Sequence, residues 1–426
     1  MAVTKDTASR RSQPSRTRRS VWNGALGLPP ILKVRSFRRV WLAGLASNAG
    51  SWFQAIAAGW LVYHYTQSPA AVGALSLVAR LPAIAFSTVA GHLADRFDRR
   101  HVGIATGLGQ SVAAVSLAFA GLAGVRSTAL IFVATFFVGL GFALGLPATL
   151  ALIGELPGRD RLPEAVRVNA AGINVARMVG PTIGGGVLVL FGPTVCFAVN
   201  AVSFLGLVIV LARLPAMPRG GGRRVATTRD ALRYAFTDPA PRRLLGGASI
   251  FCILAAPMQE LAPVVSARVG SGKGGLGLLL GAMGAGALIG AVLLSRFEAR
   301  GLARHVALPL GTTCAAVGVG LIAVSPWLWL SLIGMAAGGV FWIWIFTLTN
   351  TAIQLTSPPH LVGRMLGLYQ AAVVGPIAIG AFAAGSLAEV IGIGGSLGLC
   401  AASLAGWGWW SLAHPVREID RIAPLQ

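Results

Sequence analysis

The sequence predicts an all-α membrane protein with about twelve transmembrane helices in two pseudo-symmetric six-helix bundles. Three observations lead to this fold class: an apolar composition, a regular spacing of apolar runs, and basic residues between alternate runs. Hydrophobic residues make up 55% of the 426 residues and charged residues only 11%, whereas soluble domains typically carry about 25% charged residues. A helix needs roughly 20 apolar residues to cross the hydrocarbon core, so the crossings take up nearly the whole chain.

The apolar runs are predicted to form helices joined by short polar segments. The N-terminal bundle covers residues 40–212, with helices over 40–63, 70–92, 102–124, 128–151, 166–190 and 194–212. The C-terminal bundle covers 244–413, with helices over 244–266, 275–295, 303–324, 328–350, 364–388 and 395–413. Residues 213–243 are predicted to be a cytoplasmic linker with one surface-lying amphipathic helix over Thr227–Phe236. Residues 1–39 are predicted to be a basic, disordered cytoplasmic tail, and residues 414–426 a second cytoplasmic tail.

Basic residues indicate the orientation of the chain. The net charge is +22, and Lys and Arg concentrate in the tails, the linker and alternate loops, while the opposite loops hold only Arg126, Arg268 and Lys273. Positive residues remain on the cytoplasmic side of a membrane, so we expect both termini inside and a multi-pass protein of the inner membrane. The same placement argues against nucleic acid as the partner of these charges.

The two halves also repeat at the level of sequence. Asp95–Asp98 is echoed by Ser295–Glu298, and Gly180–Pro181 by Gly375–Pro376. Repeated halves are typical of carriers that bind substrate between the halves and expose the site alternately to each side. We therefore expect a small-molecule substrate, a membrane environment and a monomer.

The segment GHLADRFDRR follows the second predicted helix. A carboxylate is stabilised near a helix N-terminus, so Asp95 can hold another helix end and act as a conformational latch; the simpler alternative is a charged loop on the cytoplasmic side. The segment resembles the hallmark motif of the major facilitator superfamily, which implies that Asp95 lies against the start of helix eleven, near Val362–Met365. The latch residues are Gly91, Asp95, Arg96, Arg99 and Arg100.

A second motif lies in the predicted fifth helix. Gly180, Pro181, Gly184 and Gly185 are expected to kink the helix and let neighbouring backbones approach closely, although generic membrane-helix packing gives similar patterns. The segment resembles the antiporter motif of facilitator-type exporters, with Ala176 in place of an upstream glycine. Together with the sequences of residues 81–100 and 360–370, this segment resembles the transmembrane secretion effectors, the branch that includes the enterobactin exporter. That resemblance implies proton-driven efflux of a siderophore-like or drug-like compound.

Four ionisable residues are singled out within or near the predicted helices, where an ion costs at least about 2.5–3.5 kcal/mol unless it faces a partner or a wet cavity. They are Arg80, Arg177, Glu260 and Glu389, of which Glu389 is expected at the membrane interface. Arg80 and Arg177 are predicted either to bind substrate or to bond backbone carbonyls beside Pro82 and Pro181. Glu260 is a candidate for proton coupling. The alternatives are pairing with one of the two arginines of the first half and simple exposure near the outer boundary of the membrane.

Other side chains complete the predicted pathway and limit the function. Gln54 and Asn174 are candidate polar residues of an otherwise apolar cavity. The sequence has no metal-ligand spacing and no nucleotide-binding loop, so we expect neither metal, cofactor nor enzyme activity. The alternatives to an exporter are a proton-coupled importer of a small nutrient and a non-transporting membrane sensor or lipid-handling protein.

Overall fold

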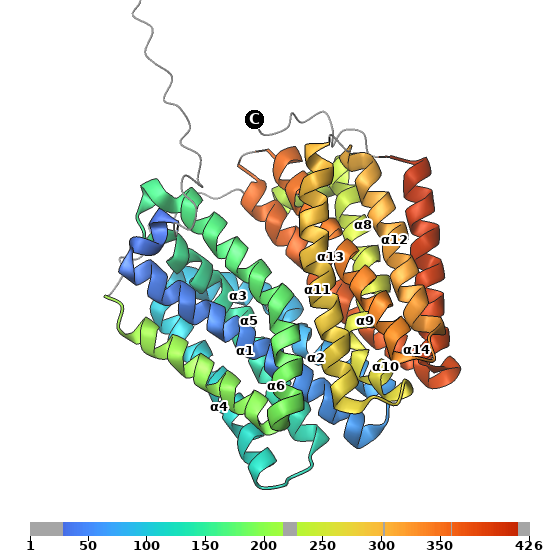
Figure 1. Ribbon diagram of the computed structural model, residues 1–426. Helices are drawn as coiled ribbons and strands as arrows, with labels where there is room; N and C mark the ends of the chain where they lie inside the picture. The colour runs from blue at the N-terminus through green and yellow to red at the C-terminus, as the bar shows by residue number, and fades with distance from the viewer. Residues whose placement is uncertain (1–28, 216–227, 301–302, 359, 416–426) are drawn as a thin grey trace, which may run out of the picture.

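A computed structural model describes residues 29–215, 228–300, 303–358 and 360–415, and the regular secondary structure in this part of the chain is all helical (Figure 1). The predicted all-α fold class is confirmed. Parts of both predicted tails and of the linker lie outside the described residues. The helices form two bundles side by side, with the N-terminal helices on the left of Figure 1 and the C-terminal ones on the right.

The first bundle contains every described element up to residue 212. Its long helices pack chiefly as α1 on α6, α4 on α5 and α6, and α2 on α5. The elements are η1 (Pro30–Lys33), α1 (Arg35–Thr66), α2 (Pro69–Ala85), α3 (Ser87–Arg96), α4 (Arg99–Leu122), α5 (Thr128–Glu155), η2 (Arg159–Arg161) and α6 (Leu162–Ala212).

The second bundle begins with a short helix of the linker. Helix α13 packs on both α11 and α12, and α14 packs on α8 and α12. The elements are α7 (Thr228–Thr237), α8 (Pro239–Ala255), α9 (Pro257–Glu260), α10 (Ala262–Arg268), α11 (Gly272–Ala299), α12 (Arg304–Val324), α13 (Leu328–Thr356) and α14 (Val362–Ala413).

Helices α6 and α14 are each two helices joined at a glycine. Gly192 has φ 79° and ψ 176°, and Gly392 has φ 74° and ψ 160°, backbone angles that only glycine adopts readily. The chain reverses at each point. In α6, for example, Gly184 contacts Phe53 of α1, and Asn200 of the other arm contacts Gly50 one turn away.

Seven described helices are long and apolar enough to cross a membrane, or eight if the bent pair Pro239–Glu260 and Ala262–Arg268 is one crossing. Two of these, α6 and α14, contain the reversals just described, and neither α1 nor the broken pair α2 and α3 meets the test. The described part of the chain therefore supports a polytopic membrane protein, while the count of twelve crossings stays a prediction.

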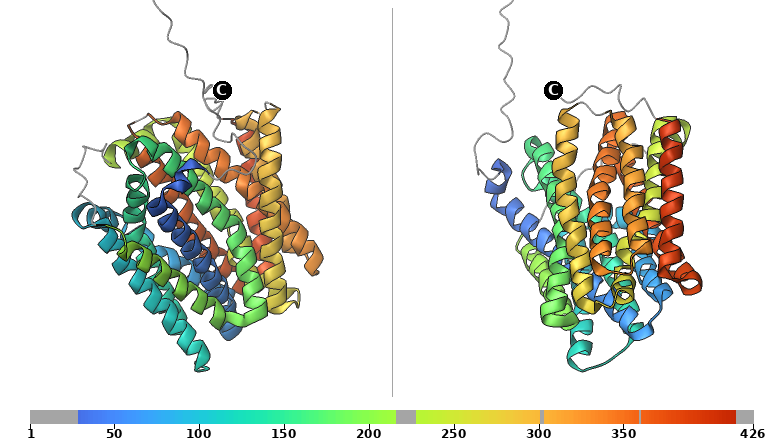
Figure 2. Two further views of the ribbon diagram at one scale, coloured as in Figure 1. Left: turned by 60° about the vertical axis from the view of Figure 1, so that its left-hand side comes forward. Right: turned by 45° about the vertical axis from the view of Figure 1, so that its right-hand side comes forward.

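The two ends of the helices are distinguished below by where the chain starts and stops. The terminal end is where α1 begins and α14 ends, uppermost in Figure 1 and in Figure 2. There, Ile31 and Leu32 are buried against Leu152, Ala165 and other apolar residues, and Glu164 accepts a hydrogen bond from the Ile31 amide at 3.0 Å. The far end is where α1 ends and where α6 and α14 reverse.

Three segments differ from the sequence-based prediction. Residues 30–33 and 35–39 belong to the predicted disordered tail but are helical, as η1 and the start of α1. The predicted helix over 70–92 ends at Ala85 and resumes as α3, so Gly91–Arg96 is helical rather than a loop. The predicted helix over 244–266 begins at Pro239 and is broken around Ala256 and Leu261, giving the short α9 and α10. Prolines explain the second break, because Pro257 and Pro263 lack the amide hydrogen that continues a helix.

Candidate functional site

A cavity of about 340 Å³ lies between the two bundles. Its walls come from α6 of the first bundle and from α9, α11, α13 and α14 of the second. The lining includes three aromatic side chains, several neutral polar groups and one charged residue. The lining residues are Ala170, Ile173, Arg177, Pro181, Gln259, Leu280, Met283, Gly284, Ala287, Trp342, Ile343, Phe346, Thr347, Asn350, Thr351, Tyr369 and Gln370.

The cavity extends from the middle of the helices toward the terminal end. Ala170 and Gln370 lie near the starts of α6 and α14, and Thr351 lies near the end of α13. On the other side, the Thr182 hydroxyl donates to the Leu280 carbonyl at 3.4 Å and limits the cavity. The bundles diverge toward the terminal end (Figure 1), on the side where these cavity-lining residues lie.

One wall of the cavity is aromatic. The Trp342 and Phe346 rings stack with centroids 4.9 Å apart, and Phe251 packs behind both at 5.6 and 6.4 Å. The Arg177 guanidinium carbon lies 5.7 Å from the centre of the Phe346 ring, which is within range of a cation–π interaction. A planar apolar group and an anionic group can therefore bind side by side on this wall.

Arg177 is the one charged residue among those that line the cavity. It lies four residues before Pro181 in α6, and Pro181 has no amide hydrogen to donate to the Arg177 carbonyl. The helix nevertheless keeps helical backbone angles through Pro181 and departs from them only at Gly192. Helical backbone angles are compatible with a bend of the helix axis, so the kink predicted at Pro181 stays a prediction.

The glycines of the same motif provide close packing. A Cβ added at Gly180 would lie 2.6 Å from the Trp52 ring, and one at Gly184 would lie 2.9 Å from Phe53. Gly185 faces the other bundle instead, where an added Cβ would lie 2.8 Å from the Cα of Gly277. The motif thus brings α6 close to α1 on one side and to α11 on the other.

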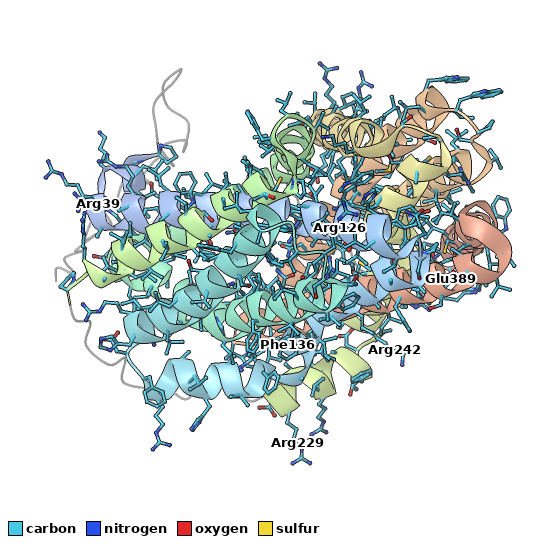
Figure 3. All side chains as sticks on the ribbon, turned by 90° about the horizontal axis from the view of Figure 1, so that it is seen from below. Arg39, Arg126, Phe136, Arg229, Arg242 and Glu389 are labelled. Carbon is cyan, nitrogen blue, oxygen red and sulfur yellow. The ribbon has the colours of Figure 1, made fainter. Side chains whose placement is uncertain are left out.

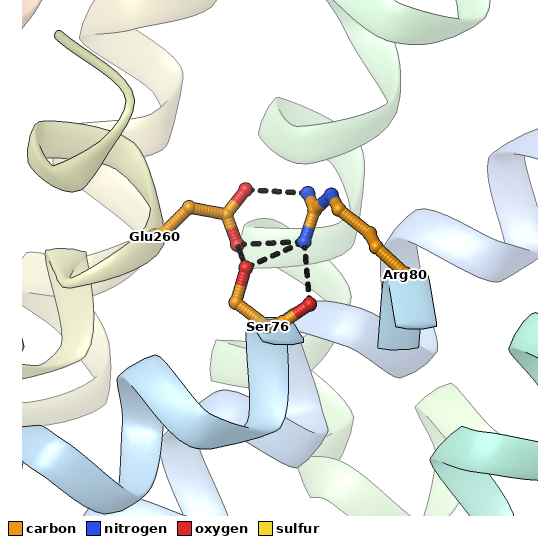
Figure 4. Close-up of polar contacts among 3 residues, drawn as sticks. All are labelled: Ser76, Arg80 and Glu260. Atoms are coloured by element: carbon orange, nitrogen blue, oxygen red, sulfur yellow. Dashed lines mark hydrogen bonds and ion pairs between the residues drawn. The ribbon is translucent and has the colours of Figure 1, made fainter. Parts of the chain in front are cut away.

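Arg80 and Glu260 form an ion pair between the bundles (Figure 4). The distance from Arg80 Nη2 to Glu260 Oε1 is 2.7 Å, and Arg80 Nη1 donates to Glu260 Oε2 at 3.3 Å. The Ser76 hydroxyl donates to Glu260 Oε2 at 2.8 Å, and Arg80 Nη1 donates to the Ser76 carbonyl at 3.2 Å. Both charged side chains are mostly buried, 22% and 17% exposed. This Arg80–Glu260 cluster joins α2 to α9.

The sequence left more than one interpretation open for each of these ions, and the structure bears on both ions. Glu260 pairs with an arginine of the other half, which was an alternative to proton coupling. Arg80 donates both to that carboxylate and to a backbone carbonyl. The neighbouring Gln259 lines the cavity. The ion pair therefore lies beside the far-end boundary of the cavity.

Beyond the cluster, toward the far end, the bundles are in close contact. Gly73 of α2 packs directly on the backbone of Ala381, and Gly385 of α14 lies against the Pro69 carbonyl. At the end of these helices, the Ser68 hydroxyl and the Ala70 amide donate to Glu389 Oε1 at 2.5 and 3.2 Å. The far end is closed.

The latch residues lie at the terminal end. Arg99 pairs with Glu155 of α5, and Arg100 Nη1 donates to the Leu214 carbonyl at 2.5 Å. Both contacts are within the first bundle. The Asp95 side chain lies outside the described residues, and Arg96 is exposed at the end of α3. Gly91 was expected at a close helix contact, but a Cβ added there meets nothing within 4 Å.

The two predicted polar pathway residues have different outcomes. Gln54 is 3% exposed and accepts a hydrogen bond from Asn200 Nδ2 at 2.7 Å, which joins α1 to α6 inside the first bundle. It is not among the residues that line the cavity. The Asn174 side chain lies outside the described residues. Phe346 and Tyr369 were missed from the sequence. Phe346 lies one helical turn before Asn350, which was an available signal, whereas spacing gives no such signal for Tyr369.

The described residues contain no group of three His, Cys, Asp or Glu side chains that could hold a metal ion. The four cysteines are unpaired thiols within helices.

This chain is similar to known membrane transporters. The sequence profile of the family described as transmembrane secretion effector matches residues 27–425. The enterobactin exporter EntS of Salmonella typhi is 27% identical over 331 residues, covering 75% of this chain and 76% of that protein. The multidrug efflux pump Tap of Mycolicibacterium fortuitum is 27% identical over 368 residues, covering 82% and 88%.

Solved structures with the same fold are also membrane transporters. A mutant form of the peptide transporter POT has a TM-score of 0.71 at 14% identity, covering 92% of this chain and 96% of that one. The nucleoside transporter NupG has a TM-score of 0.70 at 11% identity, covering 89% and 98%. These likenesses establish the fold.

Proposed function

This chain belongs to the transmembrane secretion effector family of the major facilitator superfamily, and we propose that it exports a small amphipathic compound. It is a multi-pass transporter of the inner membrane rather than an enzyme. The names of two relatives, an enterobactin exporter and a multidrug efflux pump, support a siderophore-like or drug-like substrate. We further propose that both termini are cytoplasmic, as the distribution of Lys and Arg predicts, and that the protein acts as a monomer.

The single observation that carries the proposal is a cavity between the bundles that lies toward the terminal end, while the bundles pack closely at the far end. With the termini inside, the cavity faces the cytoplasm, which is where an exporter loads its substrate. The wall of Trp342 and Phe346 suits the apolar part of an amphipathic compound, and Arg177 suits a carboxylate, phenolate or carbonyl group. Asn350 and Gln370 add neutral hydrogen-bonding groups.

The proposed energy source is a proton that binds Glu260. A proton on the carboxylate removes its charge and therefore the ion pair with Arg80. Breaking an ion pair costs about 1 kcal/mol or less at an exposed site and about 3–5 kcal/mol at a fully buried one, and this pair lies between those limits. Loss of the pair weakens the far-end contact, so a proton entering from outside favours opening to that side and release of the substrate.

Transport by everted membrane vesicles tests the proposal. Vesicles containing the protein are energised and offered a panel of siderophores and drugs, with and without a protonophore. We expect at least one amphipathic compound to accumulate and the protonophore to abolish accumulation. No accumulation of any compound contradicts export, and accumulation that persists with the protonophore contradicts proton coupling. Vesicles with the Gly186→Ala variant serve as the matched control, since a Cβ there meets no neighbouring atom within 4 Å.

A further inference from the structure

The short linker helix α7 (Thr228–Thr237) has two distinct faces. Ala231 and Ala235 are 0% and 3% exposed, and the helix packs on α8 and α14. The opposite face is exposed and combines two arginines with two apolar side chains at helical spacing, of which Phe236 is 69% exposed and Leu232 39% exposed. This basic-apolar face consists of Arg229, Leu232, Arg233 and Phe236.

Two hydrogen bonds fix the orientation of α7. The Tyr234 hydroxyl donates to the Thr356 carbonyl, at the end of α13, at 2.8 Å. Asp238 Oδ1 accepts from the Ala240 amide at 2.9 Å and caps α8. Burial and the nearby Asp238 raise the pKa of Tyr234, so the hydroxyl remains a donor at neutral pH. The basic-apolar face is thus held outward.

The position of α7 places that face at the level of a membrane surface. Asp238 leads directly into α8, whose first turn carries the exposed Arg242 and Arg243, and α8 then enters the apolar part of the bundle. Figure 3 shows Arg229 and Arg242 pointing outward at the same margin of the molecule. An exposed phenylalanine beside arginines at such a margin is typical of a helix that lies in the headgroup region of a bilayer.

We propose that the basic-apolar face of α7 binds the headgroups of anionic phospholipids in the leaflet at the terminal end. Arg229 and Arg233 pair with lipid phosphates, since guanidinium groups bind phosphate in a planar, two-pronged geometry. Phe236 and Leu232 enter the boundary between headgroups and acyl chains. Because Tyr234 ties α7 to the end of α13, bound lipid holds a wall of the cavity in place against the leaflet. The inference does not depend on the direction or substrate of transport.

Site-directed fluorescence in nanodiscs tests the inference on the full chain. A bimane label is attached at Phe236→Cys, with Cys314 replaced because it is the partly exposed native cysteine. Two quenchers are compared: a phospholipid with a nitroxide in its headgroup region, and aqueous iodide. We expect lipid quenching to rise as phosphatidylglycerol replaces phosphatidylcholine, while iodide quenching falls.

The decisive measurement is how lipid quenching depends on the two arginines of α7. Arg229→Gln with Arg233→Gln is expected to raise the half-maximal fraction of phosphatidylglycerol so far that lipid quenching does not saturate even in pure phosphatidylglycerol, because each arginine contributes about fivefold to binding. Arg39→Gln, an exposed arginine at the terminal end of the first bundle, is expected to leave it unchanged within about twofold. The inference is overturned if iodide quenches the label equally in all membranes, or if the double variant behaves like the control. A label at Leu232→Cys provides the same readout if Phe236→Cys does not yield monodisperse protein.

Discussion

The two ends of the interface between the bundles are held in different ways. At the far end, helices meet at backbone distance, as at Gly185 and Gly277, and the Arg80–Glu260 pair lies just inside that contact. At the terminal end, the bundles are separated by a cavity, and the charges of the latch segment bond within their own bundle, as Arg99 does with Glu155. The far end is therefore closed by packing that one ion pair reinforces, whereas in the proposed transport cycle the terminal end closes through contacts that form anew.

The largest effect is expected from removing the charge of Glu260. Glu260→Gln retains the shape of the side chain but leaves Arg80 without its anionic partner, so the far-end contact weakens and the proton has no site. We expect proton-driven transport in everted vesicles to fall by about 100-fold, equivalent to roughly 2.7 kcal/mol. Glu389→Gln removes a carboxylate from the same end at the exposed contact with Ser68 and is expected to retain transport within about threefold. Equal losses in both variants contradict a special role for Glu260.

The cavity between the two ends is tested by Arg177→Ala. A charge-assisted hydrogen bond is worth about 1.5–3 kcal/mol, so the KM for an anionic substrate is expected to rise by about 10–100-fold. The KM for a neutral substrate is expected to change little. Arg177→Lys retains the charge and is expected to recover part of the affinity. A uniform loss for anionic and neutral substrates indicates that Arg177 supports the helix rather than the substrate.

Packing at the far end is tested by two neighbouring glycines. Gly185→Ala places a methyl group 2.8 Å from the Cα of Gly277, whereas Gly186→Ala meets nothing within 4 Å. Overpacking costs about 1–3 kcal/mol, so Gly185→Ala is expected to slow transport by about tenfold by disfavouring the closed far end. Gly186→Ala is expected to be neutral. Transport rates of the two variants that agree within about twofold rule out a close α6–α11 contact.

The smallest effect is expected at the terminal end. The latch predicted at Asp95 operates when that end closes, so Asp95→Asn is expected to slow turnover by about fivefold, consistent with a contact of about 1 kcal/mol. Substrate binding from the terminal end is expected to be unchanged. Ser295→Ala alters the weaker copy of the motif and serves as the matched comparison, with no change expected. A change in substrate affinity without a change in turnover contradicts the latch.

Much of the fold follows from local properties of the sequence. Apolar run length places the helices, and α5 and α13 begin at Thr128 and Leu328, as predicted. The reversals at Gly192 and Gly392 lie at the predicted gaps between apolar runs. The breaks at Phe86 and Ala256 could not be placed in this way, because the chain on both sides of each is apolar.

The site required information that local patterns do not carry. Sequence indicates that Arg80 and Glu260 need partners inside a membrane, but they are 180 residues apart and their pairing depends on how the bundles meet. Gln54 resembles a pathway residue by polarity, yet its partner Asn200 lies on the arm of α6 beyond Gly192. The sequence showed Arg268 only as one of the few cations in the outer loops. In the structure it donates to the Ala323 and Ser325 carbonyls at 3.0 and 2.8 Å and so caps the C-terminal end of α12.

The far-end distance between the bundles tests the central claim most directly. Spin labels at Arg126 and Val390, two exposed far-end residues in the first and second bundles, report that distance by pulsed electron resonance. We predict a short, narrow distribution for the otherwise unaltered protein, a shift to longer distances when the pH is lowered, and a long distribution at every pH for Glu260→Gln. A Glu260→Gln distribution that coincides with that of the parent protein and retains its pH response would contradict control of the far end by the Arg80–Glu260 pair.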